Sequence, residues 1–178
     1  ISMFGAWKLG AISCHINVLQ AEDIVYYVQN ATPKVLIYTH DMFPLIHRNR
    51  DAMPSIQHYV CMDGEQEGAL DFNELLLEAP SAPKTCVEGG DAAHLSYTSG
   101  SSGMPKGALL AHGPTARATH YIAERMQLTS DCVTLGPTSP ASSYGLVVNL
   151  LPSLHRGATV GLMSKWDAAI AWEDMEKR

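Results

Sequence analysis

One stretch of the chain cannot belong to a core helix or strand. Residues 97–107 read YTSGSSGMPKG and contain three glycines, four hydroxyl residues in five consecutive positions, one proline and one lysine. Glycine costs a helix about 1 kcal/mol relative to alanine, and Pro105 lacks the backbone N–H that strand pairing needs. Apolar runs flank the stretch on both sides, which is unusual for a plain surface loop. The pattern therefore predicts a loop held between two ordered segments.

The composition of this loop suits a polyphosphate. Glycines leave backbone N–H groups accessible, the serines and Thr98 add hydroxyl donors, and Lys106 adds a positive charge. Phosphate binding is the interpretation that uses all three properties.

A Walker A loop is the first alternative. That loop requires G-x-x-x-x-G-K-[ST] followed by a helix whose N-terminus holds the phosphates. Here Pro105 precedes Lys106 and Gly107 follows it, so no Ser or Thr stands beside the lysine to hold magnesium. The residues after the loop are strand-like. A P-loop NTPase is the weaker hypothesis, and the dinucleotide pattern G-x-G-x-x-G does not occur.

The same loop closely resembles the signature of the adenylate-forming (AMP-binding) enzymes, in which threonines usually stand at the positions of Ser101 and Ser102. The flanks are similar as well. Residues 5–11 (GAWKLGA) and 22–24 (EDI), Asp91, and residues 154–158 (LHRGA) look like segments of the large N-terminal domain of an acyl-CoA synthetase. The resemblance covers the whole chain and implies a partial N-terminal domain, 1–178.

The resemblance implies a two-step acid–thiol ligase. A carboxylate attacks the α-phosphate of ATP to give an acyl-adenylate and pyrophosphate, and a thiol, usually coenzyme A, then takes the acyl group. Lys106 takes the catalytic role of neutralising charge on the leaving group. Mg²⁺ is expected on the phosphates, although no carboxylate near the loop is an obvious ligand. The residues implied in holding the ATP phosphates are Thr98, Ser99, Gly100, Ser101, Ser102, Gly103 and Lys106.

A second candidate region lies at residues 137–145, where many relatives carry a His or an aromatic residue near the acyl pocket. Ser142, Ser143 and Tyr144 are the residues that would form the acyl-site wall. A turn followed by a core helix is an equally good interpretation. A Ser-His-Asp triad lacks its G-x-S-x-G elbow. For His94 we expect a satisfied core histidine. For His112 local capping or packing is at least as good an interpretation as a catalytic role.

Alternating apolar runs and amphipathic segments predict an α/β fold with a mixed, mostly parallel sheet flanked by helices. We divide the chain into an α/β segment, 1–90, and the loop with a following α/β segment, 91–178. The expected strands are 11–18, 35–38, 56–62, 92–98, 108–111, 133–136 and 158–163. The expected helices are 1–10, 21–30, 41–49, with Asp41 as its cap, 71–79, 115–126, 146–154 and a last one from Trp166.

Length and composition argue against several classes of protein. A length of 178 residues fits one domain, a net charge of −6 without basic clusters argues against nucleic-acid binding, and the apolar runs are too short for a membrane span. The four scattered cysteines fit reduced thiols, and no metal site follows from cysteine and histidine spacing. Because no signal peptide is recognisable, we expect a cytoplasmic protein.

Both ends of the chain interrupt a pattern, so we expect a segment of a longer protein. The family's later motifs for adenine, ribose and magnesium, and the C-terminal domain with its adenylation lysine, do not occur before Arg178. We therefore expect the chain alone to be inactive, with a non-catalytic nucleotide-phosphate-binding module as the alternative. A cut-down domain would expose apolar surface and form a homodimer. The particular carboxylic acid is not readable from these residues.

Overall fold

The computed structural model describes residues 1–77, 85–98, 103–163 and 166–177. The chain forms two compact units, one comprising Val18–Lys84 and the other Ile1–Asn17 together with Thr85–Arg178. We expected residues 1–17 in the α/β segment 1–90. They belong instead to the unit that contains the predicted phosphate loop within residues 97–107, which we call the glycine-serine loop. The reason is strand pairing, because β1 (Ser13–Cys14) runs parallel to β5 (Ala92–Thr98).

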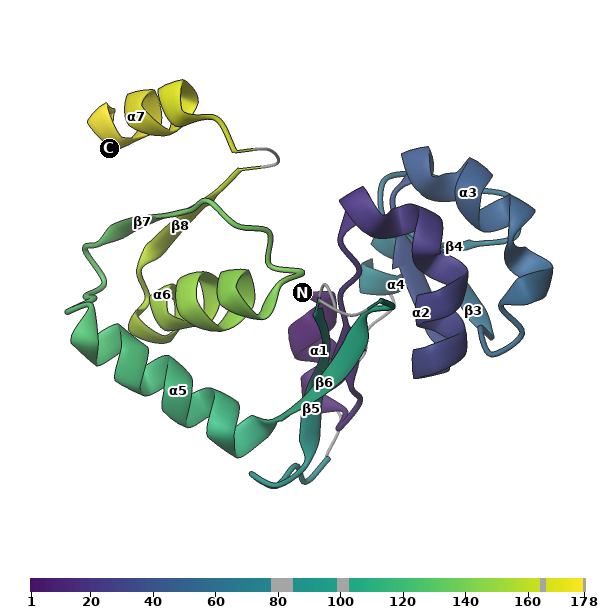
Figure 1. The fold of residues 1–178 in the computed structure, drawn as a ribbon, viewed down its shortest axis with the longest axis horizontal. Helices are drawn as coiled ribbons and strands as arrows, with labels where there is room; N and C mark the ends of the chain where they lie inside the picture. The colour runs from purple at the N-terminus through teal and green to yellow at the C-terminus, as the bar shows by residue number, and fades with distance from the viewer. Residues whose placement is uncertain (78–84, 99–102, 164–165, 178) are drawn as a thin grey trace. The chain divides into compact units, whose positions relative to one another are not determined.

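The unit Val18–Lys84 is built on a three-stranded parallel sheet in the order β2-β3-β4 (Figure 1). Its strands are β2 (Val35–Tyr38), β3 (His58–Cys61) and β4 (Leu70–Asp71). Its helices are η1 (Val18–Asp23), α2 (Ile24–Ala31), η2 (His40–Met42), α3 (Phe43–Arg48), η3 (Arg50–Ala52) and α4 (Phe72–Leu77).

Apolar side chains form the core of this unit. On α2, buried Ile24, Tyr27 and Val28 recur at the three- and four-residue spacing of one helix face. The last three residues of β3 are also buried. The strand expected at 35–38 is present with the same bounds, but in β2 Val35 and Ile37 are exposed although all four residues are apolar or aromatic.

The other unit contains a three-stranded sheet in the order β1-β5-β6, with β6 (Lys106–Ala111) antiparallel to β5. It also contains a parallel pair, β7 (Val133–Gly136) and β8 (Thr159–Leu162). Its helices are α1 (Ser2–Lys8), α5 (His112–Arg125), η4 (Tyr144–Leu150), α6 (Leu151–Arg156) and α7 (Ala168–Glu176).

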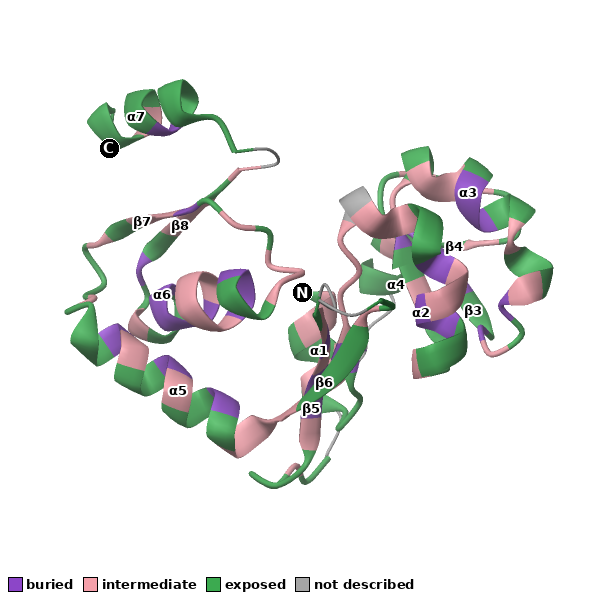
Figure 2. Ribbon diagram, in the orientation of Figure 1, coloured by how far each residue is buried: buried purple, intermediate pink, exposed green. Residues whose placement is uncertain are grey.

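Only one narrow stripe of side chains along helix α5 is buried. Thr115, Thr119 and Ala123 are its buried residues, and the purple segments of Figure 2 recur along the helix at this four-residue spacing. Helix η4 is a π-helix rather than the α-helix that the sequence predicts from Leu146. Short π-helical stretches are frequent at functional sites.

The mixed α/β architecture with mostly parallel strands is confirmed. The differences are local. The strand expected over 11–18 is confined to Ser13–Cys14, and a 3-10 turn (η1) occupies the start of the helix expected over 21–30. Asp41 lies inside η2 and accepts from the Thr39 hydroxyl, so it does not cap a helix. The strand 92–98 matches residue for residue.

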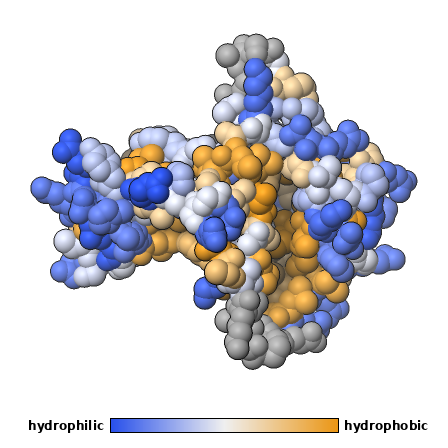
Figure 3. Space-filling view, turned by 90° about the horizontal axis from the view of Figure 1, so that it is seen from below, coloured by the Kyte–Doolittle hydropathy of each residue, from blue (hydrophilic) through white to orange (hydrophobic). Residues whose placement is uncertain are grey.

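Many large apolar side chains remain on the surface, where Figure 3 shows them in orange. Among them, Phe4 is 41% exposed, Leu109 60% and Leu162 53%. None of the helices in the described parts of the chain is long and apolar enough to cross a membrane.

Candidate functional site

The two ends of the glycine-serine loop are brought together by a β-hairpin. Strands β5 and β6 pair so that Thr98 lies opposite Lys106, and the Thr98 hydroxyl donates to the Lys106 carbonyl at 3.4 Å. The Lys106 side chain is exposed. The predicted phosphate ligands Ser99, Gly100, Ser101 and Ser102 lie outside the described residues.

Of the glycines beside the loop, one is required by the backbone. Gly103 has a φ of +134°, a conformation that L side chains rarely adopt, and open space surrounds its Cα. A Cβ on Gly107 would lie 2.9 Å from Leu95 Cδ1, so a side chain after Lys106 would require the Leu95 side chain to move. The hairpin end therefore presents a lysine, a threonine and an open glycine backbone together, which is a donor set that fits phosphate oxygens.

The second predicted segment, residues 137–145, is folded back on itself. The Ser142 hydroxyl donates to the Ser139 carbonyl at 2.9 Å and accepts from the Gly145 N–H at 3.0 Å. A Cβ on Gly145 would lie 2.2 Å from the Ser139 carbonyl oxygen, so only glycine fits there. Ser142 thus holds a turn, whereas Tyr144 is 59% exposed.

Ser143 is exposed but differs from its neighbours because its hydroxyl contacts a buried side chain. Its Oγ lies 2.7 Å from the Oγ of Ser96, which is fully buried on β5. Ser96 lies on the same face of that strand as Thr98, since side chains alternate along a strand. The contact joins the predicted acyl-site segment to the strand that leads into the glycine-serine loop.

Farther along the same face of β5, His94 is fully buried in a polar chain of contacts. The Trp7 indole N–H donates to Ser13 Oγ at 2.9 Å, and Ser13 Oγ lies 2.8 Å from His94 Nδ1. The other ring nitrogen of His94, Nε2, is buried without a hydrogen-bond partner. The expectation of a satisfied core histidine is therefore only half met.

A second histidine lies beside it. The rings of His15 and His94 are 5.0 Å apart between centroids. His15 bonds to the backbone of Pro140, while its Nδ1 is buried without a partner. Burial lowers the pKa of His15, and burial together with His15 lowers the pKa of His94 from 6.5 to about 4. Both imidazoles are therefore neutral near pH 7. Nothing in the local sequence marks this cluster, because its members come from segments about 80 residues apart.

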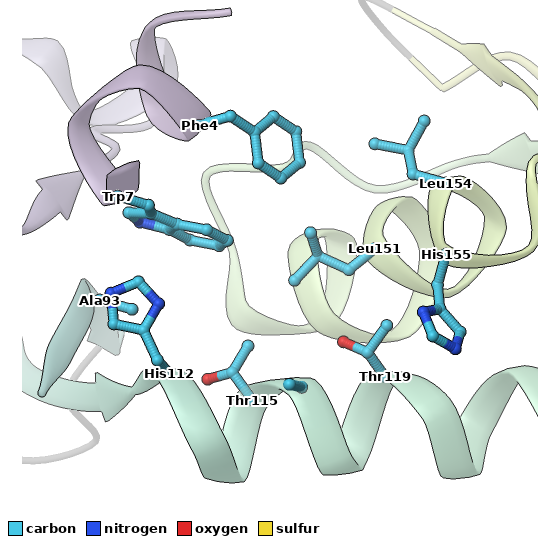
Figure 4. A pocket seen from close by; sticks show the side chains of 10 residues that line it. Phe4, Trp7, Ala93, His112, Thr115, Thr119, Leu151, Leu154 and His155 are labelled. Atoms are coloured by element: carbon cyan, nitrogen blue, oxygen red, sulfur yellow. The ribbon is translucent and has the colours of Figure 1, made fainter. Parts of the chain in front are cut away.

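A pocket of about 570 Å³ lies between α1, the first half of α5 and α6 (Figure 4). Its walls are mostly apolar or aromatic. Trp7 contacts Phe4 and His112 edge to face at 5.5 and 5.7 Å between ring centroids. The lining residues are Phe4, Trp7, Ala93, His112, Thr115, Ala116, Thr119, Leu151, Leu154 and His155.

His112 belongs to this pocket and not to the loop. It is the first residue of α5, its backbone N–H donates to the Asp91 carbonyl at 2.9 Å, and its ring packs on Trp7. This contact agrees with the packing interpretation, while Nε2 of the ring is buried without a hydrogen-bond partner. Asp91 itself accepts from the Glu88 N–H through its carboxylate, a local turn contact at the start of β5.

Within the described ranges, no group of three His, Cys, Asp or Glu side chains is placed to hold a metal ion. All four cysteines are free thiols. The described residues therefore offer no ready-made cluster of ligands for the Mg²⁺ implied by the resemblance.

Comparison with known proteins decides the family. The AMP-binding enzyme family matches residues 1–178, the full chain. The chain belongs to the AMP-binding enzymes.

Similar proteins within this family are CoA ligases. A crotonobetaine/carnitine–CoA ligase from Salmonella paratyphi A is 27% identical over 181 aligned positions, which cover 98% of this AMP-binding chain and 35% of the relative. The anthranilate CoA ligase AuaEII, solved with anthranoyl-AMP, is 28% identical with a TM-score of 0.82, over 98% of this chain and 34% of its own.

A third similarity shows the fold alone. ATP-bound MatB from Rhodopseudomonas palustris has a TM-score of 0.81 at 19% identity, over 98% of this chain and 34% of MatB. The chain thus spans about one third of the length of these relatives. The resemblance to adenylate-forming ligases seen in the sequence is confirmed.

Proposed function

We propose that the chain is the phosphate-loop segment of an ATP-dependent, AMP-forming acyl- or aryl-CoA ligase. The observation that carries the proposal is the β5–β6 hairpin, which sets Lys106 opposite Thr98 at the two ends of the glycine-serine loop in a member of the AMP-binding family. The substrate is a carboxylic acid, the co-substrates are ATP and coenzyme A, and Mg²⁺ accompanies the nucleotide.

In this proposal the chain binds the part of ATP that becomes pyrophosphate. The Thr98 hydroxyl and the serine hydroxyls of the loop donate to β- and γ-phosphate oxygens, and the open backbone at Gly103 lets N–H groups approach them. Lys106 offsets the negative charge that develops on the leaving pyrophosphate as the α-phosphate is attacked. The side chains of Ser142, Ser143 and Tyr144 lie on the acyl side.

The chain spans about one third of the length of its ligase relatives. In this proposal the groups that hold adenine and ribose, and the adenylation lysine, belong to the parts of a ligase that these 178 residues do not match. We propose that residues 1–178 alone bind phosphates without turnover, that their exposed apolar surface promotes a homodimer, and that the protein works in the cytoplasm.

The test is nucleotide binding. Titration of the chain with ATP by calorimetry is expected to show binding that Lys106→Ala weakens at least about tenfold, because a charge-assisted hydrogen bond contributes about 1.5–3 kcal/mol. Lys34→Ala, at an exposed lysine of the other unit, is the matched control and leaves the affinity unchanged. Equal ATP affinity in wild type and Lys106→Ala contradicts the proposed role of the loop.

Turnover separates the two candidate functions. The chain alone is expected to release no more pyrophosphate than Lys106→Ala. A ligase hybrid in which these residues replace the corresponding third of a relative restores carboxylate-dependent pyrophosphate release if the segment serves a ligase. A non-catalytic phosphate-binding module would bind ATP yet leave the hybrid inactive.

A further inference from the structure

Two residues that line the pocket between α1, α5 and α6 carry a buried polar atom without a hydrogen-bond partner. One atom is the hydroxyl oxygen of Thr119, a residue that is 6% exposed, and the other is Nε2 of His112. Buried polar atoms in proteins are normally hydrogen-bonded. Two unpaired ones in the wall of the same 570 Å³ cavity therefore point to polar groups that a bound molecule supplies.

Both residues belong to one face of helix α5. His112, Thr115 and Thr119 follow one another at intervals of three and four residues, which is the spacing of a single helix face. At about 1.5 Å of rise per residue, the first and the last are about 10 Å apart along the helix axis. Figure 4 shows the threonine side chains rising from α5 toward Trp7 and Leu151. This side of the pocket therefore offers a hydrogen-bonding group near each end.

The other walls of the pocket are aromatic and aliphatic. Phe4 and Trp7 of α1 contact each other edge to face, and the Trp7 ring also contacts His112. The indole N–H of Trp7 donates to Ser13 Oγ at 2.9 Å, which holds the ring in place. Leu151 adds an aliphatic surface from α6. Walls of this kind favour a flat, apolar ring system, because aromatic rings pack well edge to face and offset against one another.

Charge separates this pocket from the predicted ligase sites. None of the ten described residues that line it is a Lys, Arg, Asp or Glu. ATP, coenzyme A and a carboxylate are anions, and burial of a charge without a paired partner is unfavourable. The lining residues also include none from 97–107 or 137–145, the segments that hold the predicted phosphate and acyl residues. The pocket is therefore suited to an uncharged molecule.

We propose that this pocket is a binding site for an uncharged aromatic molecule that carries hydroxyl groups. A hydroxyl both donates and accepts, so it pairs with the Thr119 hydroxyl and also with Nε2 of His112, whether or not that nitrogen carries a proton. The cavity volume lies within the range of about 300–1,000 Å³ that is typical of small-molecule sites. This site is additional to those of the proposed ligase and does not depend on that function.

A series of naphthalenes tests the class of ligand. We expect naphthalene-2,6-diol to bind at least about tenfold more tightly than naphthalene, because it forms two additional hydrogen bonds. We expect 2-naphthoate to bind at least about tenfold more weakly than the diol, because its carboxylate has no paired cation. Titration followed by the indole ¹H–¹⁵N resonance of Trp7, identified by its loss in Trp7→Phe, reports binding at this pocket.

Thr119→Val is the decisive variant, because it keeps the branched shape and removes the hydroxyl. Since that hydroxyl has no partner in the protein, the variant is expected to unfold at an equal or higher urea concentration than wild type. It should nevertheless weaken diol binding at least about threefold and leave naphthalene binding unchanged. His112→Phe should act in the same way on the second hydroxyl. Thr159→Val, at an exposed threonine of β8, is the matched control and should leave both affinities unchanged.

Four results overturn the site. They are no binding of the diol, equal affinities for the diol and naphthalene, naphthoate binding as tight as that of the diol, and a diol preference that persists in Thr119→Val. Diol binding that leaves the Trp7 resonance unmoved also overturns it. Each of these results leaves the phosphate loop untouched, because the test of that loop is the Lys106-dependent affinity for ATP.

Discussion

The interiors of the two units differ in chemistry. In Val18–Lys84 the buried side chains are large and mostly apolar, such as Val28 and Met53, each 1% exposed. In the other unit the fully buried side chains include His94 and Ser96 on one strand, and alanines supply much of the apolar core. Across the described residues, the buried polar side chains are Ser13, His94, Ser96, Thr115, Thr119 and Ser153, all in that second unit.

This difference separates a scaffold from a candidate site. Apolar burial stabilises at about 25 cal/mol per Å² without needing specific partners, whereas a buried polar group is tolerated only when it is hydrogen-bonded. A unit that buries polar groups therefore has a lower free energy of unfolding unless each of those groups has a hydrogen-bond partner in the protein or in a bound ligand. The unit that does so is also the one that carries Lys106 and the segment 137–145.

The largest expected effect is in the apolar unit. Met53→Ala should lower the local free energy of unfolding by about 2–5 kcal/mol, because it empties a site that is 1% exposed. Hydrogen exchange of the β3 amides measures this. Met62→Ala, at a methionine 42% exposed in the same unit, is the control and should cost below about 1 kcal/mol. Equal losses would mean that Met53 does not fill a tight core.

A smaller effect is expected in the segment 137–145. Gly145→Ala should cost about 1–3 kcal/mol, since the new Cβ would meet the backbone of Ser139 at 2.2 Å and force the turn to shift. Tryptophan fluorescence during urea unfolding reports this, because Trp7, Trp166 and Trp172 all belong to this unit. Gly5→Ala on α1, with open space around it, should leave stability equal or slightly higher. A neutral Gly145→Ala would refute the tight turn.

A third expected effect is a dependence on pH. Burial holds the pKa of His94 at about 4 in the folded state, against 6.5 when it is unfolded, so the unfolded chain takes up a proton first as pH falls. Stability of this unit should therefore decrease between about pH 6.5 and 4, by at most about 1.4 kcal/mol per pH unit, and this contribution should level off below pH 4.

The matched variants for this pH effect are His94→Asn, whose amide oxygen can still accept from Ser13, and His120→Asn on the exposed face of α5. We expect the first to flatten the tryptophan-monitored pH profile and the second to retain it. The lowered pKa of His15 acts in the same direction and accounts for any residual slope. An unchanged profile in His94→Asn would show that His94 is not buried as a neutral ring.

Several structural features of this protein are determined by the local amino-acid sequence. The strand 92–98 was predictable to the residue because a polar-to-glycine boundary ends it. The loop expected over 97–107 is shorter than predicted at both ends, because Tyr97 and Thr98 belong to β5 and Lys106 and Gly107 to β6. The last helix, expected from Trp166, begins at Ala168, because the Asp167 carboxylate accepts from two N–H groups of α7 and caps it. Membership of the AMP-binding family was predicted from the same local pattern and is confirmed by the family match over residues 1–178. The roles of the individual loop residues stay a prediction.

Tertiary structure alone decided the rest. The grouping of residues 1–17 with the loop depends on the pairing of Ser13 with His94, and the exposure of Val35 depends on which face of β2 is covered. The polar cluster joins Trp7, Ser13 and His94 across about 80 positions of sequence. Hydrogen bonds between residues so far apart leave no periodicity or spacing in the chain, so their donors and acceptors can be matched only after the strands have been placed side by side.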